Sequence, residues 1–148
     1  MPRRISEAPE FLLLDTHVWI WYRDGAEDRL APSVVAWLRR HGAAGLLRVS
    51  PISGWEVATL VAKQRLALSR EVRAWIREAL EAPGVRAAEL TLEMAMDAAL
   101  LVGNAPRDPA DRMLIATARA LGATLVTRDA EILAYGRGGH VRVMDAGG

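Results

Sequence analysis

Short apolar runs that alternate with helical segments constrain the fold of this 148-residue chain most strongly. Four runs have strand character, because they are short, apolar and bounded by polar or turn-forming residues. They lie at 11–15, 46–50, 123–127 and 140–144, and a weaker candidate lies at 85–90. Continuous apolar runs are typical of strands buried on both faces, so the pattern predicts an α/β fold with a central, mainly parallel sheet covered by helices on both sides.

Helical segments separate these runs and carry recognisable start and stop signals. The five segments begin at Pro32, Ser53, Ser69, Thr91 and Asp108. Several of the first residues are Ser, Thr or Asp, which cap helix N-termini by accepting backbone N–H bonds. Gly103 and Gly122 stand where two of the helices are expected to end, because glycine adopts the left-handed cap conformation without strain.

The length of the chain predicts one domain over residues 1–148, with a frayed N-terminus at 1–9 and a flexible tail at 145–148. No apolar stretch approaches the roughly 18 residues that a membrane helix needs. Arg3 and Arg4 are not followed by the apolar core of a signal peptide. We therefore expect a cytoplasmic protein that makes no membrane contact.

Composition narrows the possible chemistry. The chain has no cysteine, which excludes disulfides, thiolate-bound zinc and cysteine nucleophiles. Its histidines at 17, 41 and 140 lack metal-ligand spacing, so any metal must be held mainly by oxygen. The net charge of +1 does not mark a nucleic-acid binder. Lys63 is the only lysine among 19 basic residues, a bias that a GC-rich genome would produce, although particular arginines remain candidates for binding phosphate.

Four acidic residues recur at the same kind of position, just after a strand or in the first turn of a helix. They are Asp15, Glu56, Asp111 and Asp129. In an open parallel sheet the carboxyl ends of the strands form the ligand-binding edge, so these acids are expected to meet there. Two carboxylates about 5 Å apart repel by roughly 3 kcal/mol at an effective dielectric near 20. A hard divalent cation would offset this repulsion, and all-oxygen ligation favours Mg²⁺ or Mn²⁺.

A purely local role is the alternative for each acid alone. Asp108 is a good N-cap before Pro109, and Asp111 at the third helical position favours the positive end of the helix dipole. Glu56 could complete a capping box with Ser53. The joint placement of the acids, rather than any single one, favours a metal site.

Three stretches resemble the PIN-domain ribonucleases, and in particular the VapC toxins of bacterial and archaeal toxin–antitoxin pairs. They are LLLDTHVWIW at 12–21, SPISGWEVATLVAKQRLAL at 50–68 and RDPADRMLIATARALGATLVTRDAEI at 107–132. The resemblance implies an α/β/α sandwich, a Mg²⁺ or Mn²⁺ site and endonucleolytic RNA cleavage. It places the acidic quartet of the family on Asp15, Glu56, Asp111 and Asp129. His17 stands where the motif often has asparagine.

The resemblance also assigns supporting roles and partners. It aligns the third acid with Asp111, which leaves Asp108 as a cap near the site. We expect Asp15 and Asp111 to contact the metal directly, and the hydroxyls of Thr16 and Thr127 to orient water. Arg112 would pair with a carboxylate or meet substrate phosphate. The resemblance further implies 5′-phosphate products, a VapB-like antitoxin and a homodimer.

Other functions fit the sequence less well. A haloacid-dehalogenase phosphatase needs a second acid two residues after Asp15, where His17 stands, and a receiver domain needs a lysine after a late strand. A stand-alone PIN nuclease in RNA processing and a catalytically silent interaction module remain as alternatives. The five tryptophans are expected to pack in the core or between helices rather than to stack on bases, and Trp37 and Trp75 are candidates for lining a groove for a partner helix.

Overall fold

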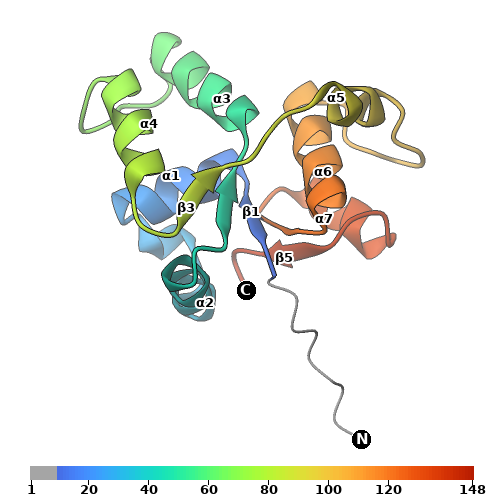
Figure 1. The fold of residues 1–148 in the computed structure, drawn as a ribbon, viewed down its shortest axis with the longest axis horizontal. Coiled ribbons are helices and arrows are strands. Elements are labelled where there is room, and N and C mark those ends of the chain that lie inside the picture. The colour runs from blue at the N-terminus through green and yellow to red at the C-terminus, as the bar shows by residue number, and fades with distance from the viewer. Residues whose placement is uncertain (1–9) are drawn as a thin grey trace, which may run out of the picture.

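A computed structural model describes residues 10–148, and these residues form the predicted three-layer α/β/α sandwich (Figure 1). The sheet has the strand order β3-β2-β1-β4-β5, and every neighbouring pair is parallel. The strands are β1 Leu12–Leu14, β2 Leu47–Val49, β3 Val85–Ala87, β4 Thr124–Thr127 and β5 Val143–Asp145. Because β1 pairs with β2 on one side and β4 on the other, the chain changes direction across the sheet between β1 and β4, which is where ligand crevices form in open parallel sheets.

Seven α-helices and one short 3-10 helix connect the strands within the described residues. They are α1 Thr16–Asp24, η1 Glu27–Arg29, α2 Pro32–Ala43, α3 Pro51–Ala62, α4 Val72–Glu81, α5 Leu92–Ala99, α6 Pro109–Leu121 and α7 Ala130–Arg137. Helices α1 to α4 lie on one side of the sheet and α5 to α7 on the other (Figure 1).

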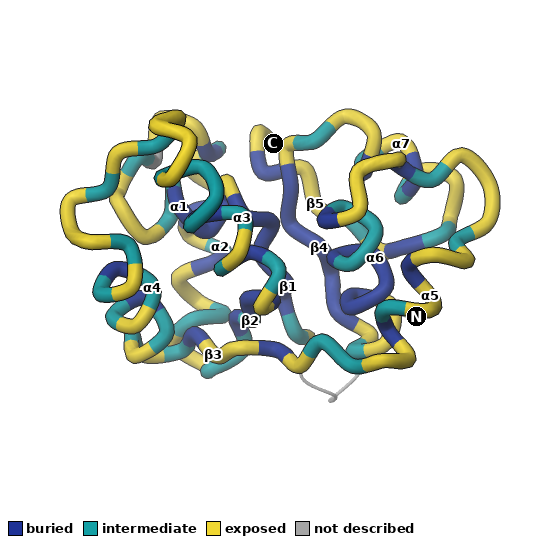
Figure 2. Tube along the Cα trace, turned by 90° about the horizontal axis from the view of Figure 1, so that it is seen from above, coloured by how far each residue is buried: buried dark blue, intermediate teal, exposed yellow. Residues whose placement is uncertain are grey.

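Each face of the sheet has its own apolar core. Leu12 and Leu14 of β1 point to the side of α1, α2 and α4, whereas Leu13 points to α6 and α7. This alternation is the period of two that a strand imposes. Figure 2 shows the result: the segments at the centre of the molecule are buried, and the helices on either side are exposed on their outer turns. Trp19 and Trp75 meet edge to face at 5.0 Å in the first core, so the predicted packing role is confirmed for both.

Several predicted boundaries are wrong by a few residues. Helix α3 begins at Pro51 with Ser50 as its N-cap, rather than at Ser53. Helix α4 begins only at Val72, and α5 ends before Gly103. Strand β5 is displaced from the expected 140–144. Helices α1 and α7 were not among the predicted segments, because apolar residues follow one another in both without a clear polar face.

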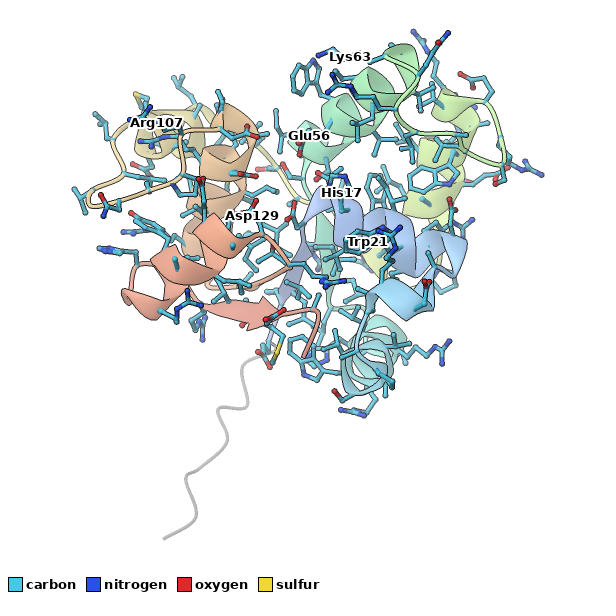
Figure 3. All side chains as sticks on the ribbon, turned by 180° about the vertical axis from the view of Figure 1, so that it is seen from behind. His17, Trp21, Glu56, Lys63, Arg107 and Asp129 are labelled. Atoms are coloured by element: carbon cyan, nitrogen blue, oxygen red, sulfur yellow. The ribbon has the colours of Figure 1, made fainter. Side chains whose placement is uncertain are left out.

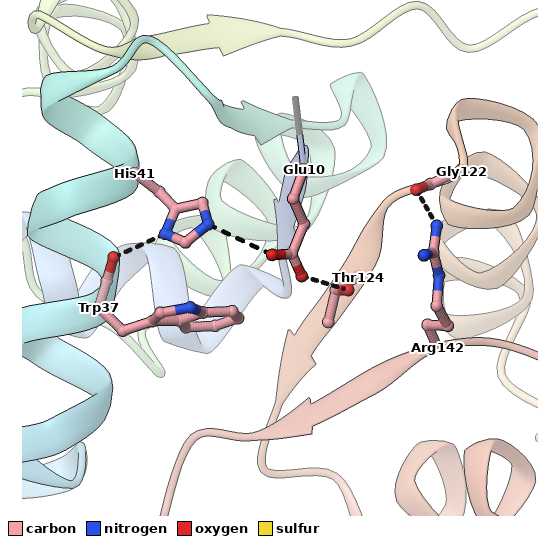
Figure 4. Close-up of polar contacts among 6 residues, drawn as sticks. All are labelled: Glu10, Trp37, His41, Gly122, Thr124 and Arg142. Carbon is pink, nitrogen blue, oxygen red and sulfur yellow. Dashed lines mark hydrogen bonds and ion pairs between the residues drawn. The ribbon is translucent and has the colours of Figure 1, made fainter. Parts of the chain in front are cut away.

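The edge of the sheet at the strand N-termini is closed by polar contacts (Figure 4). Glu10 accepts a hydrogen bond of 3.1 Å from the hydroxyl of Thr124 and lies 3.5 Å from Nε2 of His41. Arg142 donates to the carbonyl oxygen of Gly122, the left-handed C-cap of α6. Glu10 thereby links α2 to β4, while Arg142 ties the segment before β5 to the end of α6.

A flexible tail is expected at 145–148, but the first residues of this segment contact the rest of the fold. Asp145 belongs to β5, and Ala146 is buried, donating to Thr127 and accepting from Ala31 through its backbone. The expected fraying of 1–9 lies outside the described residues. No helix within residues 10–148 is long and apolar enough to span a membrane.

Candidate active site

One cavity at the carboxyl ends of β1 and β4 collects the four predicted acids. Its volume is about 470 Å³. It is lined by Asp15, His17, Trp21, Arg29, Glu56, Asp108, Asp111, Arg128 and Asp129. Figure 3 shows Glu56 and Asp129 coming from different halves of the molecule, with His17 and Trp21 on a neighbouring helix in the half that carries Glu56. Residues that are far apart in the sequence thus share one opening.

Asp15 is the most deeply placed of these acids. It follows β1 directly, and its Oδ1 accepts the N–H of Thr16 at 2.7 Å as the N-cap of α1. Its Oδ2 accepts the hydroxyl of Thr127 at 2.6 Å, which joins the ends of β1 and β4. Burial raises the pKa of Asp15 above its ordinary value, although both hydrogen bonds oppose this shift by favouring the carboxylate.

Glu56 reaches the cavity from α3, and its carboxylate is held by the linked hydroxyl groups of Thr16 and Ser53. Oγ1 of Thr16 lies 2.5 Å from Oε1 of Glu56 and 2.8 Å from Oγ of Ser53. Since Thr16 has a single hydroxyl proton and the carboxylate is the stronger acceptor, we infer that Ser53 donates to Thr16 and Thr16 to Glu56. Burial, followed by the charges of Asp15 and Asp108, raises the pKa of Glu56. The predicted capping box is wrong: Ser53 is a buried residue inside α3, one turn before Glu56.

Asp15, Asp108 and Asp129 all cap helices whose N-termini surround the cavity. Oδ1 of Asp108 accepts the N–H of Ala110 at 2.8 Å in α6, and Oδ1 of Asp129 accepts the N–H of Ile132 at 2.9 Å in α7. The positive ends of α1, α6 and α7 therefore lie beside the acids and offset part of their repulsion. Capping and lining the site are consequently not alternatives for these residues, because each cap bond uses one carboxylate oxygen.

Asp111 differs from the other acids, because no hydrogen bond or ion pair to its side chain is found among residues 10–148. It lies in the first turn of α6 and is half-buried. Burial and the negative charges of Asp108, Asp15, Asp129 and Glu56 raise its pKa to about 8. The carboxylate of Asp111 is therefore the one that most lacks a compensating charge.

The cavity suits a hard divalent cation in its chemistry. All the candidate ligands are carboxylate or hydroxyl oxygens, and no ion pair in the described part of the chain neutralises them. Mg²⁺ and Mn²⁺ prefer such donors. No group of three or more acidic or histidine side chains in residues 10–148 is already arranged around one point, so ligation requires side-chain rotation toward the ion. The carboxylate of Asp111 and the second oxygens of Asp108 and Asp129 make no hydrogen bond among residues 10–148, whereas the second oxygen of Asp15 accepts the Thr127 hydroxyl.

Arg112 does not lie in the cavity with its neighbour Asp111. Its guanidinium donates to the carbonyl oxygens of Ala98, Ala99 and Pro106, and so secures the end of α5 to the start of α6. Sequence reasoning also missed the cavity-lining Trp21, Arg29 and Arg128. Only the position of Arg128 between Thr127 and Asp129 offered a signal for it.

The raised pKa of Asp111 predicts a pH-dependent stability in metal-free buffer. A carboxyl whose pKa is higher when folded stabilises the fold fully below the pKa of the unfolded chain, near 3.8, and this contribution is lost as the pH rises through about 8. Asp111→Asn should therefore melt higher than wild type in EDTA at pH 8.5, with a smaller gain at pH 5. After discounting for solvent screening, we expect a difference of about 1–2 kcal/mol, or roughly 3–8 °C in Tm.

Thermal melts of both proteins at the two pH values measure this effect, with Asp97→Asn on the exposed side of α5 as the control. Adding Mg²⁺ or Mn²⁺ at pH 8.5 should raise the Tm of wild type more than that of Asp111→Asn. An equal Tm for wild type and Asp111→Asn at every pH would contradict the electrostatic account of the cavity.

The chain belongs to the PIN-domain family: the family model, described as "PIN domain", matches residues 12–138. Ribonuclease VapC22 from Mycobacterium tuberculosis is 34% identical over 124 residues, which cover 84% of this chain and 91% of the relative. The predicted resemblance to VapC ribonucleases is thereby confirmed.

Solved structures share the same fold at low sequence identity. VapBC2 from Rickettsia felis, crystallised bound to a DNA fragment from its promoter, gives a TM-score of 0.63 at 15% identity and covers 90% of this chain and 97% of that one. FitAcB from Neisseria gonorrhoeae gives 0.61 at 24% identity, with coverages of 92% and 98%. These similarities support the PIN-like α/β/α architecture.

Proposed function

We propose that this chain is a Mg²⁺- or Mn²⁺-dependent endoribonuclease that acts as the toxin of a toxin–antitoxin pair. The observation that carries the proposal is the single cavity in which Asp15, Glu56, Asp111 and Asp129 meet at the carboxyl ends of β1 and β4. Membership of the PIN family and the likeness to a VapC ribonuclease support the choice of RNA as substrate.

The proposed roles follow from the contacts of each acid. Asp15 and Asp111 would hold the cation directly, and Glu56 and Asp129 directly or through water. When bound, the cation would supply charge relief on the phosphate and activation of the attacking water. Thr127 holds Asp15 through its hydroxyl and accepts the N–H of Asp129 at 2.9 Å, so it fixes two of these acids relative to each other. Thr16 holds the side chain of Glu56 through its own hydroxyl.

Half-buried carboxylates at the mouth of a cleft suit unpaired RNA. A single strand can bring its backbone into the cavity, whereas a duplex presents its phosphates on a rigid rod with little freedom to enter. Attack of water on the phosphorus with departure of the 3′-oxygen, as the resemblance to the family implies, would leave a 5′-phosphate on one fragment and a 3′-hydroxyl on the other. We expect this reaction in the cytoplasm, on exposed loops or single-stranded regions of folded RNA.

We also propose a VapB-like antitoxin as the partner. A hollow of about 270 Å³ lies between α1, α2 and α4, and its lining includes Trp19, Tyr22, Ala79 and Val85. The lining also includes Arg23 and Arg39, and a hollow of this mixed apolar and basic character between helices fits the side chains of an amphipathic partner segment. Trp37 is partly buried against the same core, whereas Trp75 is buried, so Trp75 is not a main part of an exposed groove. Co-expression with a short open reading frame upstream of the gene, followed by co-purification, tests this partner.

A homodimer is proposed from the exposed apolar residues of α5 and the loop after it. Leu92, Met96 and Leu100 are spaced four residues apart and lie on one side of the helix, and Val102 follows. Folded monomers rarely expose such a run, so a second copy of the chain is a fitting cover. Sedimentation equilibrium of the isolated chain tests this pairing.

The proposed function is tested by incubating the purified protein with a structured RNA, an unstructured single strand and duplex DNA. We expect cleavage of the RNA in unpaired regions with Mg²⁺ or Mn²⁺, and complete inhibition by EDTA. Cleavage that persists in EDTA would overturn the metal mechanism. Absence of cleavage on all substrates would favour the silent interaction module, and a gene without an antitoxin neighbour would favour a stand-alone processing nuclease.

A further inference from the structure

Trp21, Arg29 and Arg128 line the acid cavity but have no part in the proposed chemistry. They come from three separate elements: α1, η1 and the loop between β4 and α7. Trp21 lies on the same side of the molecule as His17 and Asp129 (Figure 3). We call these three residues the Trp–Arg rim.

The rim is held together by its own contacts. The guanidinium carbons of Arg29 and Arg128 lie 5.8 and 5.9 Å from the centroid of the Trp21 ring, within the range of a cation–π interaction. Arg128 also donates from Nη1 to the backbone carbonyl of Arg29 at 2.8 Å. Both cationic groups are therefore placed beside the cavity by the indole ring and by each other.

Neither Arg29 nor Arg128 forms an ion pair with the carboxylates that line the cavity. The ion pairs found among residues 10–148 join His41 to Glu10 and Arg70 to Glu78, both outside the cavity. Arg29 and Arg128 are exposed, and apart from the bond of Arg128 to the carbonyl of Arg29, no hydrogen bond from either guanidinium group is found in the described part of the chain. The cavity thus carries two unneutralised cations at its edge and carboxylates in its interior.

This separation of charge matches the needs of a polyanionic strand. An RNA phosphate that approaches five carboxylates is repelled, and fixed guanidinium groups at the entrance counter that repulsion. Arginine binds phosphate oxygens through paired donors, and a preformed position reduces the entropy lost on binding. Arg128 stands between Thr127, which bonds Asp15, and Asp129, so a phosphate held there is next to the acid cluster.

We propose that the Trp–Arg rim is a clamp for the RNA backbone: Arg29 and Arg128 bind a phosphate neighbouring the scissile bond, and Trp21 is a positioning residue for both arginines. The inference rests on the proposed ribonuclease function, because it names how that substrate is held. An acidic segment of a protein partner is the competing ligand, but it offers neither the regular phosphate spacing nor a reason to lie beside a hydrolytic site.

The test is RNA binding as a function of salt, measured in the cleavage-deficient Asp111→Asn background. Fluorescence anisotropy of a labelled, unstructured single strand gives the Kd at KCl concentrations between about 50 and 200 mM. In a plot of the logarithm of the association constant against the logarithm of the salt concentration, each phosphate contact contributes a slope of about −0.7. Arg29→Gln and Arg128→Gln should each weaken binding about tenfold and reduce the slope by about 0.7. Arg40→Gln, an exposed position on α2, is the matched control and should change neither.

The test of Trp21 must distinguish its proposed role in positioning the two arginines from its contribution to the core, because its ring also packs on the core. Trp21→Phe retains an aromatic face and should keep the wild-type slope, whereas Trp21→Leu should weaken binding even at temperatures well below its Tm. Unchanged Kd and slope in both arginine variants would overturn the clamp while leaving cleavage by wild type, and thus the proposed function, intact. Loss of binding to a polyglutamate peptide with no change for RNA would instead assign the rim to an acidic protein partner.

Discussion

Asp15→Asn is expected to abolish RNA cleavage, with a fall in kcat/KM of at least about 10³-fold, or roughly 4 kcal/mol in transition-state stabilisation. Asparagine keeps the size of the side chain, so its oxygen can still accept the N–H of Thr16 and cap α1. Its amide nitrogen would replace the oxygen that accepts the Thr127 hydroxyl, which can rotate and accept instead. The fold should therefore persist, while one negative ligand is lost.

Asp108→Asn is the matched control for this variant, because both substitutions replace an N-cap aspartate that lines the same cavity. Asparagine caps a helix about as well as aspartate, and we place Asp108 beside the cation rather than on it. Its activity should fall by less than about tenfold. Equal losses in the two variants would contradict the division of roles, and an active Asp15→Asn protein with a sharply lower Tm would make Asp15 structural.

The position of the acids could be predicted because it follows from topology. Asp15 comes directly after an apolar run and Asp129 two residues after another, and parallel strands bring such residues to one edge of the sheet. Asp108 and Gly122 mark the limits of α6 as expected, since caps act through bonds to the nearest backbone groups. These features depend on local sequence and on a single tertiary rule.

The other features of the site depend on contacts between distant segments. The hydrogen bonds from Ser53 through Thr16 to Glu56 join α1 to α3, and no spacing of residues in the sequence predicts them. Arg112 is adjacent to Asp111, yet its guanidinium donates to the carbonyl groups at the end of α5 rather than to that carboxylate. The Trp–Arg rim requires η1 to lie against the loop after β4, which only the folded chain reveals.

A helix cap and a metal ligand do not exclude each other at this edge of the sheet. A helix that begins at the carboxyl end of a strand needs an acceptor at its first residue, and the same edge of the sheet is where a cation site forms. Asp15 and Asp129 each make the cap bond through one oxygen, Oδ1, which leaves the other oxygen to face the proposed cation. A capping signal directly after a buried strand is therefore compatible with a role in the site.

Glu56→Gln is expected to lower cleavage by at least about 10²-fold, or roughly 2.7 kcal/mol. Glutamine preserves the length of the side chain, and its oxygen can accept the Thr16 hydroxyl as Oε1 does now. The variant therefore removes one negative charge with little change in shape. Measuring kcat and KM separately shows where the loss arises: a fall in kcat at constant KM means that the glutamate acts in the transition state, on the cation or its water.

Two further variants make this result specific. Glu131→Gln removes an exposed charge from the first turn of α7, near the cavity but outside it, and should retain wild-type activity. Thr16→Val deletes the hydroxyl that holds Glu56 while keeping the charge and the branched shape. If that hydroxyl orients the carboxylate, Thr16→Val should lose less activity than Glu56→Gln, and the two losses should not add in the double variant, because both act through one side chain. A Glu56→Gln protein as active as wild type would remove Glu56 from the proposed site and leave Asp15, Asp111 and Asp129 to hold the cation.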